Sequence, residues 1–276
     1  MNVADPYAHT QQAAPRILRR SLAEYPGYSY LIRLPENPDP DRLLLVVHGI
    51  ARQAGYMLQA LSNEADKASY TMIAPLFSYR DYPDYQRLGR SGKGKRADLA
   101  VLATLADLRE NLEFESGFHL FGFSGGAQFA HRFVYAWPDR VRSVCLASAG
   151  WYTPPDGTQR FPYGTGNTER LRGVDFHADR LARTPTLVAV GNKDTDRDEA
   201  LRQTDRVDTL QGRNRRRRAE WFHRSLKAAA AQRGHRALHE FALLDDTRHD
   251  FGEAVHQGGL ASKLFDFCER AARHDN

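Results

Sequence analysis

The chain has 276 residues, of which 41% are hydrophobic and 26% are charged, and its formal net charge is +5. These values are typical of one globular domain, or of a core with a small insertion. No apolar run approaches the roughly 18–20 residues of a membrane span. The two cysteines, Cys145 and Cys268, are too few for a disulfide framework, so we expect free thiols.

The N-terminal segment differs in composition from the rest of the chain. Residues 1–16 contain alanine, glutamine and two prolines, which predicts a flexible arm ahead of a single domain over 17–276. The arm has no basic segment followed by an apolar one, so no signal peptide is visible. We therefore expect a cytoplasmic protein without membrane attachment.

Short apolar runs alternate with helical patterns from residue 17 onward. Strands are expected at 17–21, 28–34, 43–47, 71–75, 118–123, 141–147, 186–191 and 237–244, the first two as an antiparallel edge pair. Helices are expected at 54–68, 98–112, 128–137, 215–232 and about 260–271. This alternation predicts an α/β fold with a mostly parallel sheet and helices on both faces.

One strand leads directly into a serine motif. The run 118–123 ends in Gly122-Phe123-Ser124-Gly125-Gly126, which fits the pattern Gly-x-Ser-x-Gly of a nucleophile elbow between a strand and a helix. Gly122 and Gly126 leave room for a strained turn, and the N–H of Gly125 could stabilise an oxyanion. An inert serine in a glycine-rich turn is the alternative.

Two later strand ends carry candidate partners for the serine. Asp194 follows the strand 186–191 and His249 follows the last strand, which gives the order Ser, Asp, His of an α/β-hydrolase triad. His249 would take the proton of Ser124, and Asp194 would orient the imidazole. Asp196 and Asp198 lie close enough in the chain to replace Asp194.

The remaining histidines have no assigned chemistry. His48 is expected to support its loop rather than to act as a base. The histidine spacing does not match a metal motif such as His-Glu-x-x-His, so no metal is expected.

From about Leu43 to its end, the chain resembles the α/β-hydrolase family, and especially bacterial poly(3-hydroxybutyrate) depolymerase/LpqC-like esterases. The motifs that carry the resemblance are 47–49 (VHG), 74–78 (APLFS), 121–129 (FGFSGGAQF), 149–153 (AGWYT), 191–194 (GNKD) and 249–250 (HD). The resemblance implies a serine hydrolase without cofactor. It also implies an oxyanion hole from the N–H groups of Gly125 and Ile50, with Ala51 as second choice. Phe123 departs from the histidine that many relatives carry before the serine.

Two aromatic loops, about 78–96 and 150–178, leave carboxyl ends of strands and are expected to border the active site. We hypothesise that Tyr85, Trp151 and Tyr152 bind the acyl or alcohol part of an ester. Ordered surface loops without a binding role are the alternative.

Charge and loop length bear on the substrate. Arg80, Arg87 and Arg90 could favour an acidic substrate. The polar segment from Asp194 to Gly212 is too short for a cap domain, so an open site is expected.

The sequence thus predicts a serine esterase that cleaves small or polymeric carboxylic esters through an acyl-enzyme intermediate. Within hydrolases, a peptidase or thioesterase is the alternative, because one fold hosts several activities. A non-catalytic binding protein that uses the basic run Arg213–Arg218 is another. This run is more simply the solvated start of a helix, so no nucleic acid is expected as partner.

Overall fold

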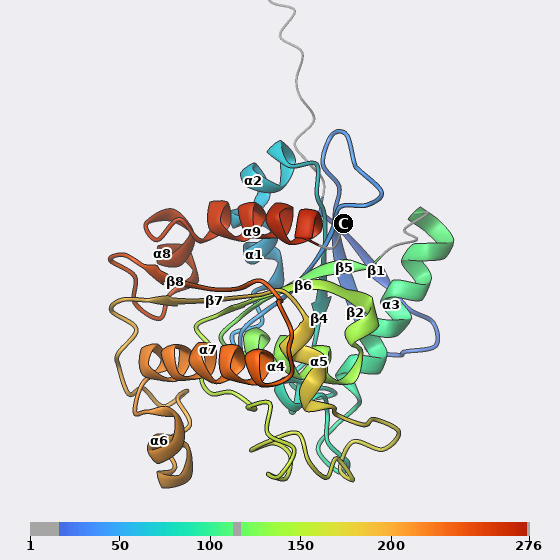
Figure 1. The fold of residues 1–276 in the computed structure, drawn as a ribbon. Helices are drawn as coiled ribbons and strands as arrows, with labels where there is room; N and C mark the ends of the chain where they lie inside the picture. The colour runs from blue at the N-terminus through green and yellow to red at the C-terminus, as the bar shows by residue number, and fades with distance from the viewer. Residues whose placement is uncertain (1–16, 113–116, 275–276) are drawn as a thin grey trace, which may run out of the picture.

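The computed structural model describes residues 17–112 and 117–274, and the arm expected at 1–16 lies outside them. Eight strands form one sheet (Figure 1), and only β2 runs against the others. In spatial order they are β1 (Ile17–Ser21), β2 (Ser29–Arg33), β4 (Thr71–Leu76), β3 (Leu43–Val47), β5 (Phe118–Phe123), β6 (Val141–Ala147), β7 (Thr186–Gly191) and β8 (His239–Leu244). Each strand expected from the sequence is present, and the mostly parallel sheet is confirmed.

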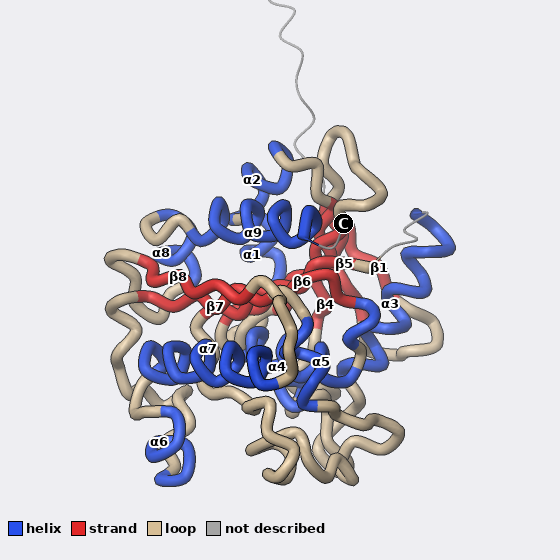
Figure 2. Tube along the Cα trace, viewed as in Figure 1, coloured by secondary structure: helices blue, strands red, loops and turns tan. Residues whose placement is uncertain are grey.

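Helices cover both faces of this sheet (Figures 1 and 2). One face carries α3 (Ala97–Leu112), α4 (Gly125–Ala136), α5 (Ala178–Arg183) and α7 (Arg215–Gln232). The other face carries α1 (Ala54–Ala60), α2 (Ser62–Lys67), α8 (Phe251–His256) and α9 (Leu260–His274). The short helix α6 (Asp205–Gln211) packs against α7, and two 3₁₀ turns, η1 (Tyr85–Arg87) and η2 (Pro138–Arg140), lie in loops.

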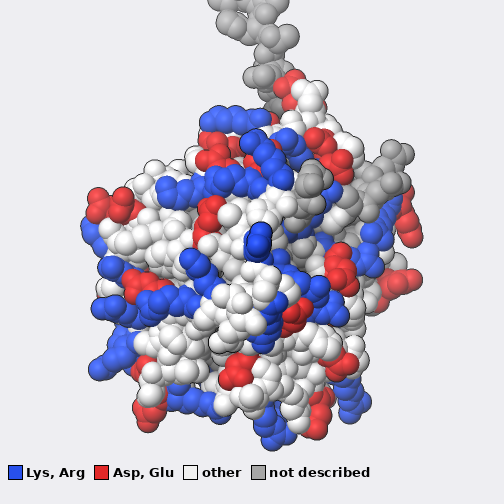
Figure 3. All heavy atoms as spheres, viewed as in Figure 1, with Lys and Arg blue, Asp and Glu red and all other residues white. Residues whose placement is uncertain are grey.

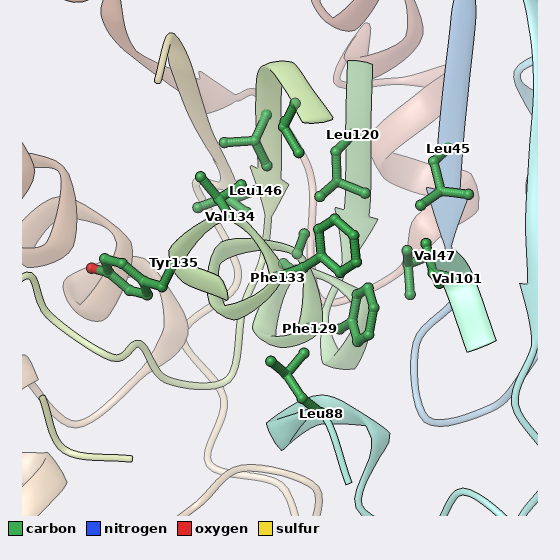
Figure 4. Close-up of a cluster of buried hydrophobic side chains, with 14 of the residues drawn as sticks. Leu45, Val47, Leu88, Val101, Leu120, Phe129, Phe133, Val134, Tyr135 and Leu146 are labelled. Carbon is green, nitrogen blue, oxygen red and sulfur yellow. The ribbon is translucent and has the colours of Figure 1, made fainter. Parts of the chain in front are cut away.

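Strand β3 shows why the sheet needs two covered faces. All five of its side chains are buried, and alternate ones enter opposite hydrophobic clusters. Leu45 and Val47 join the cluster on the α4 side, whereas Leu44 and Val46 join the cluster on the α9 side. Figure 4 shows the first cluster, in which Leu45 and Val47 lie on the same side of the sheet as Phe129 and Phe133 of α4.

Several helical details differ from the sequence-based expectation. The helix expected over 54–68 is divided at Leu61 into α1 and α2. The helices α5, α6 and α8 were not expected, because six or seven residues are too few to show a helical period.

Cys145 and Cys268 are both buried and unpaired, as the sequence predicted. Among the helices of the described ranges, none combines the length and the apolar character needed to cross a membrane.

Candidate active site

Ser124 occupies a strained turn between β5 and α4. Its backbone lies at φ 54° and ψ −113°, a region that non-glycine residues rarely adopt, and it forms the N-cap of α4. The turn is possible because the neighbouring glycines lack side chains. A Cβ on Gly122 would clash with the backbone of Gly126, and a Cβ on Gly126 would clash with the carbonyl of Val47. The serine side chain therefore projects from the carboxyl end of β5.

A hydrogen-bonded chain connects Ser124 to two residues far away in the sequence. The Nε2 atom of His249 lies 3.0 Å from Ser124 Oγ, and its Nδ1 atom lies 2.9 Å from Asp194 Oδ2. Strands β5, β7 and β8 run parallel, so the loops that follow them meet at one edge of the sheet. This arrangement is the one a serine nucleophile, its base and an orienting carboxylate require.

Burial differs along this chain. Asp194 has a side chain that is 0% exposed, the side chain of His249 is 19% exposed, and Ser124 is partly exposed. A ligand can therefore approach the serine, while the carboxylate is shielded from water. Of the alternatives to Asp194, Asp196 is exposed and Asp198 pairs with the guanidinium of Arg215.

The residues expected to form the oxyanion hole lie together. Gly125 is the first residue of α4, so its N–H has no acceptor within the helix. A Cβ on Gly125 would lie 3.1 Å from Cγ2 of Ile50, which shows that the two residues are neighbours. The structure thus places Ile50 next to Gly125, the residue that follows Ser124, and the role of both in stabilising an oxyanion stays a prediction.

His48 supports the loop that carries Ile50. Its Nε2 accepts a hydrogen bond from the N–H of Phe77 at 3.2 Å, and its Nδ1 lies 2.9 Å from the carbonyl of Gly49. Burial lowers the pKa of His48 to about 4. A neutral imidazole with both nitrogens in hydrogen bonds holds its loop in place, which is the supporting role that the sequence predicted for His48.

Tyr85 lies beside the serine turn but is itself buried. Its hydroxyl donates to the carbonyl of His48 at 3.0 Å and would lie 2.6 Å from a Cβ on Gly125. Tyr79, in contrast, is exposed, and its hydroxyl donates to the carbonyl of Ile50 at 2.8 Å. Tyr85 is therefore placed to shape the turn, and ligand contact by it stays a prediction.

Trp151 and Tyr152 are placed differently from an open binding wall. Trp151 is 3% exposed and contacts the guanidinium groups of Arg132 and Arg202, 4.7 and 5.0 Å from its ring centroid. Tyr152 is fully buried and stacks on Phe222 of α7 at 4.2 Å between ring centroids. Because α7 covers the ring of Tyr152, neither this residue nor Trp151 is open to solvent, and ligand contact by either of them stays a prediction.

The basic run Arg213–Arg218 is not a uniformly solvated face. Arg215 and Arg218 are 1% and 0% exposed, and each pairs with a carboxylate, Asp198 and Asp208 respectively. A spacing of three residues turns both arginines toward the protein interior. The expectation of a solvated helix start is thus wrong for these two arginines.

The other arginines named from the sequence also differ from one another. Arg87 and Arg90 both pair with Asp84, which offsets part of their charge. Arg80 is exposed. On the face seen in Figure 3, basic and acidic side chains are interspersed.

A cavity of about 720 Å³ lies beyond the 150–178 loop. Pro154, Tyr163 and Trp221 are among the residues that line it, and Ser124, Asp194 and His249 are not. The ring of Tyr163 packs against Trp151 at 5.5 Å between centroids. The cavity is therefore lined partly by this loop and includes no member of the hydrogen-bonded chain at Ser124.

Solved structures with similar folds include two that align over nearly the whole chain. LpqC, a poly(3-hydroxybutyrate) depolymerase from Bordetella parapertussis, is 27% identical, with a TM-score of 0.73 over 95% of this chain and 94% of that one. Poly(aspartic acid) hydrolase-1 from Sphingomonas sp. KT-1 is 23% identical, with a TM-score of 0.75 over 90% and 99%. The chain has the α/β-hydrolase fold.

A more distant example of this fold is an S-formylglutathione hydrolase from Agrobacterium tumefaciens. It is 14% identical, with a TM-score of 0.57 over 89% of each chain. No protein-family model and no curated protein sequence matches the chain. The similarity to these solved structures confirms the α/β-hydrolase fold that the sequence motifs predicted.

Two contacts in this α/β-hydrolase site were missed by sequence reasoning. Phe123 stacks on the imidazole of His249, with ring centroids 5.4 Å apart and planes at 21°, and packs edge-on against Phe251. Arg215 approaches Asp194, with 3.7 Å between Nη1 and Oδ1. The unusual residue before the serine was a signal for the first contact. The arginine run was a signal for the second, but it does not reveal which members turn inward.

Proposed function

We propose that the protein is a serine hydrolase that cleaves carboxylic esters. The observation that carries the proposal is the continuous hydrogen-bonded chain from Asp194 through His249 to the partly exposed Ser124. Ser124 would attack the ester carbonyl and form an acyl-enzyme intermediate, which water then hydrolyses. Similarity to the LpqC depolymerase supports an ester as substrate.

Each residue has a defined part in this mechanism. His249 takes the proton of Ser124 during attack and gives it to the leaving alcohol, and Asp194 holds the imidazole and stabilises its charged form. The N–H groups of Gly125 and Ile50 would donate to the oxyanion, at the positive end of α4. The strained backbone of Ser124 supports this assignment, because it costs free energy and is typical of functional sites.

The test compares hydrolysis of p-nitrophenyl butyrate by the wild type, Ser124→Ala and a control, Ser91→Ala. Ser91 is exposed and takes no part in the hydrogen-bonded chain from Asp194 to Ser124. Loss of the nucleophile should lower kcat by about 10³-fold or more, because the remaining groups catalyse only weakly. Ser91→Ala should behave as the wild type.

A fluorophosphonate probe supplies a second measurement that does not depend on substrate choice. It should add covalently to the peptide that contains Ser124, and mass spectrometry would locate it. Full activity in Ser124→Ala would move the reaction to another residue. Absence of both hydrolysis and labelling in the wild type would overturn the proposal.

A second candidate is hydrolysis of an amide in an acidic polymer. Similarity to poly(aspartic acid) hydrolase-1 and a net charge of +5 favour it. Incubation with poly(aspartic acid) and with poly(3-hydroxybutyrate), followed by analysis of fragment length, separates the two candidates. Ser124→Ala is the control in both reactions.

A further inference from the structure

Arg215, the first residue of α7, lies between two carboxylates. Its Nη1 and Nη2 atoms donate to Oδ2 and Oδ1 of Asp198, each at 2.8 Å. The same Nη1 atom lies 3.7 Å from Oδ1 of Asp194. The side chains of Arg215 and Asp194 are 1% and 0% exposed, so little water screens this approach.

The two carboxylate oxygens of Asp194 have different surroundings. Oδ2 is 2.9 Å from Nδ1 of His249, whereas Oδ1 has no hydrogen-bond partner among the described residues. Arg215 is the cation that approaches this second oxygen. The start of α7 is also tied to the backbone, because the N–H of Arg216 donates to the carbonyl of Asp194 at 3.2 Å.

Other charged or titratable groups lie around this pair, and one is Arg218 of α7, whose pKa is lowered by burial and, less strongly, by the charge of Arg215. The loop after β7 supplies Asp198, and the loop after β6 supplies the buried Tyr152, whose pKa is raised by burial and, less strongly, by the charge of Asp194. The β5–α4 turn supplies Ser124. The loop of His249 itself carries the exposed pair Arg248–Glu253.

Building on the proposed function, we propose that Arg215 is a positioning residue for the reaction at Ser124. Its guanidinium, held by Asp198, lies behind the carboxylate of Asp194 and keeps that group oriented toward His249. Arg215 touches neither the serine nor the imidazole, so it would act only through Asp194 and through its charge.

The arrangement predicts opposite effects for two substitutions. The guanidinium lowers the pKa of the Asp198 carboxyl through their hydrogen bonds, so both groups are charged at neutral pH. Without the cation, two carboxylates remain near His249 and favour its protonated form. Without the anion of Asp198, the cation is no longer offset and disfavours that form.

The experiment records kcat/KM against pH for the wild type, Arg215→Met, Arg215→Lys and Asp198→Asn. The acid limb of this profile reports protonation of the base. We expect its midpoint to move up by about 0.5–1 pH unit in Arg215→Met and down by a similar amount in Asp198→Asn. Arg215→Lys keeps the charge and should stay closer to the wild type.

Arg217→Met is the matched control. Arg217 lies on the same helix, its side chain is 73% exposed, and it pairs with Glu220. Its profile should match that of the wild type. Thermal unfolding of each variant identifies any that fails to fold. If Arg215→Met does not fold, Asp198→Asn still provides an independent test.

A second readout separates this proposal from the proposed function. The titration of His249 is followed by NMR of ¹³C-labelled histidine, with His249→Gln used for assignment. If the midpoint of the His249 titration moves up in Arg215→Met and down in Asp198→Asn, the positioning role is supported even if no ester is hydrolysed. Normal hydrolysis with unchanged midpoints in both folded variants would overturn it and leave the proposed function intact.

Discussion

Phe123 connects the serine turn to the imidazole. Its backbone precedes Ser124, and its ring stacks on His249 and meets Phe251 edge-on. The ring is 6% exposed, so the contact is shielded from water. Aromatic contacts of this kind contribute about 0.5–1.5 kcal/mol beyond area burial. The residue before the nucleophile therefore limits the positions available to the proposed base.

Replacing Phe123 by leucine should lower kcat/KM about tenfold, which corresponds to a lost contact of about 1.4 kcal/mol. Phe123→His keeps an aromatic ring and should retain more activity than Phe123→Leu. Both variants are assayed on the same ester, with His249 titration as a second readout. Equal activity of the leucine variant and the wild type would show that the stacked ring has no effect on the reaction.

At the scale of elements, the β5–α4 connection depends on how closely α4 approaches the end of β3. Gly126 lies in the first turn of α4, where a Cβ would meet the carbonyl carbon and oxygen of Val47. The backbone of a central strand cannot move away without breaking its ladder to β5. Ser124 is thus presented by a contact between two elements as well as by its own dihedral angles.

Gly126→Ala should destabilise the protein by about 3 kcal/mol or more, because overpacking here acts against backbone. Gly55→Ala is the matched control, since Gly55 is also helical and its Cβ would lie 3.7 Å from Leu31 Cδ1, an ordinary contact. That control should stabilise the protein by about 0.5–1 kcal/mol. Urea unfolding measures both, and equal stabilities would contradict the close-approach argument.

At the scale of the whole molecule, five histidines have lowered pKa values, and three of them are fully buried. Burial lowers the pKa of His48 and of His119 to about 4, and it lowers the pKa of His131 well below its usual value. Each neutral ring has a hydrogen-bond partner, such as the hydroxyl of Ser143 beside His119. These groups lie in the loop after β3, in β5 and in α4, so acid acts on the sheet and on the helix against it.

The free energy of unfolding should fall as the pH drops from about 6.5 toward 4. Over this range the unfolded chain binds protons at histidines that the folded protein keeps neutral, and the stabilisation is fully present above pH 6.5. Each such histidine contributes up to about 1.4 kcal/mol per pH unit. Urea unfolding at pH 8, 6 and 5 measures the slope.

Two variants test this assignment. His119→Gln should reduce the slope by up to one proton's contribution, because it removes one of the buried imidazoles. His256→Gln is the control, since His256 is exposed, and should leave the slope unchanged. If the free energy of unfolding does not change between pH 8 and pH 5, the three buried histidines do not make the stability depend on pH.

The sheet was predictable because its strands carry local signals. Continuous apolar runs such as 43–47 require burial on both faces, and the alternation of strands and helices allows few topologies. The positions of Ser124, Asp194 and His249 at strand ends also follow from chain order, since parallel strands bring their carboxyl ends to one edge. Their mutual hydrogen bonds come from that geometry.

Only the tertiary structure decided which side chains face the site. Tyr152 was expected to bind a ligand because it is an aromatic residue in a loop at a strand end, yet α7 covers its ring. The same helix turns Arg215 inward, while Arg217 stays exposed. Orientation around a helix depends on what packs against it, and a run of identical arginines carries no period to reveal it. The sequence by itself therefore determined the sheet and the order of the candidate site, whereas packing between distant segments determined its surroundings.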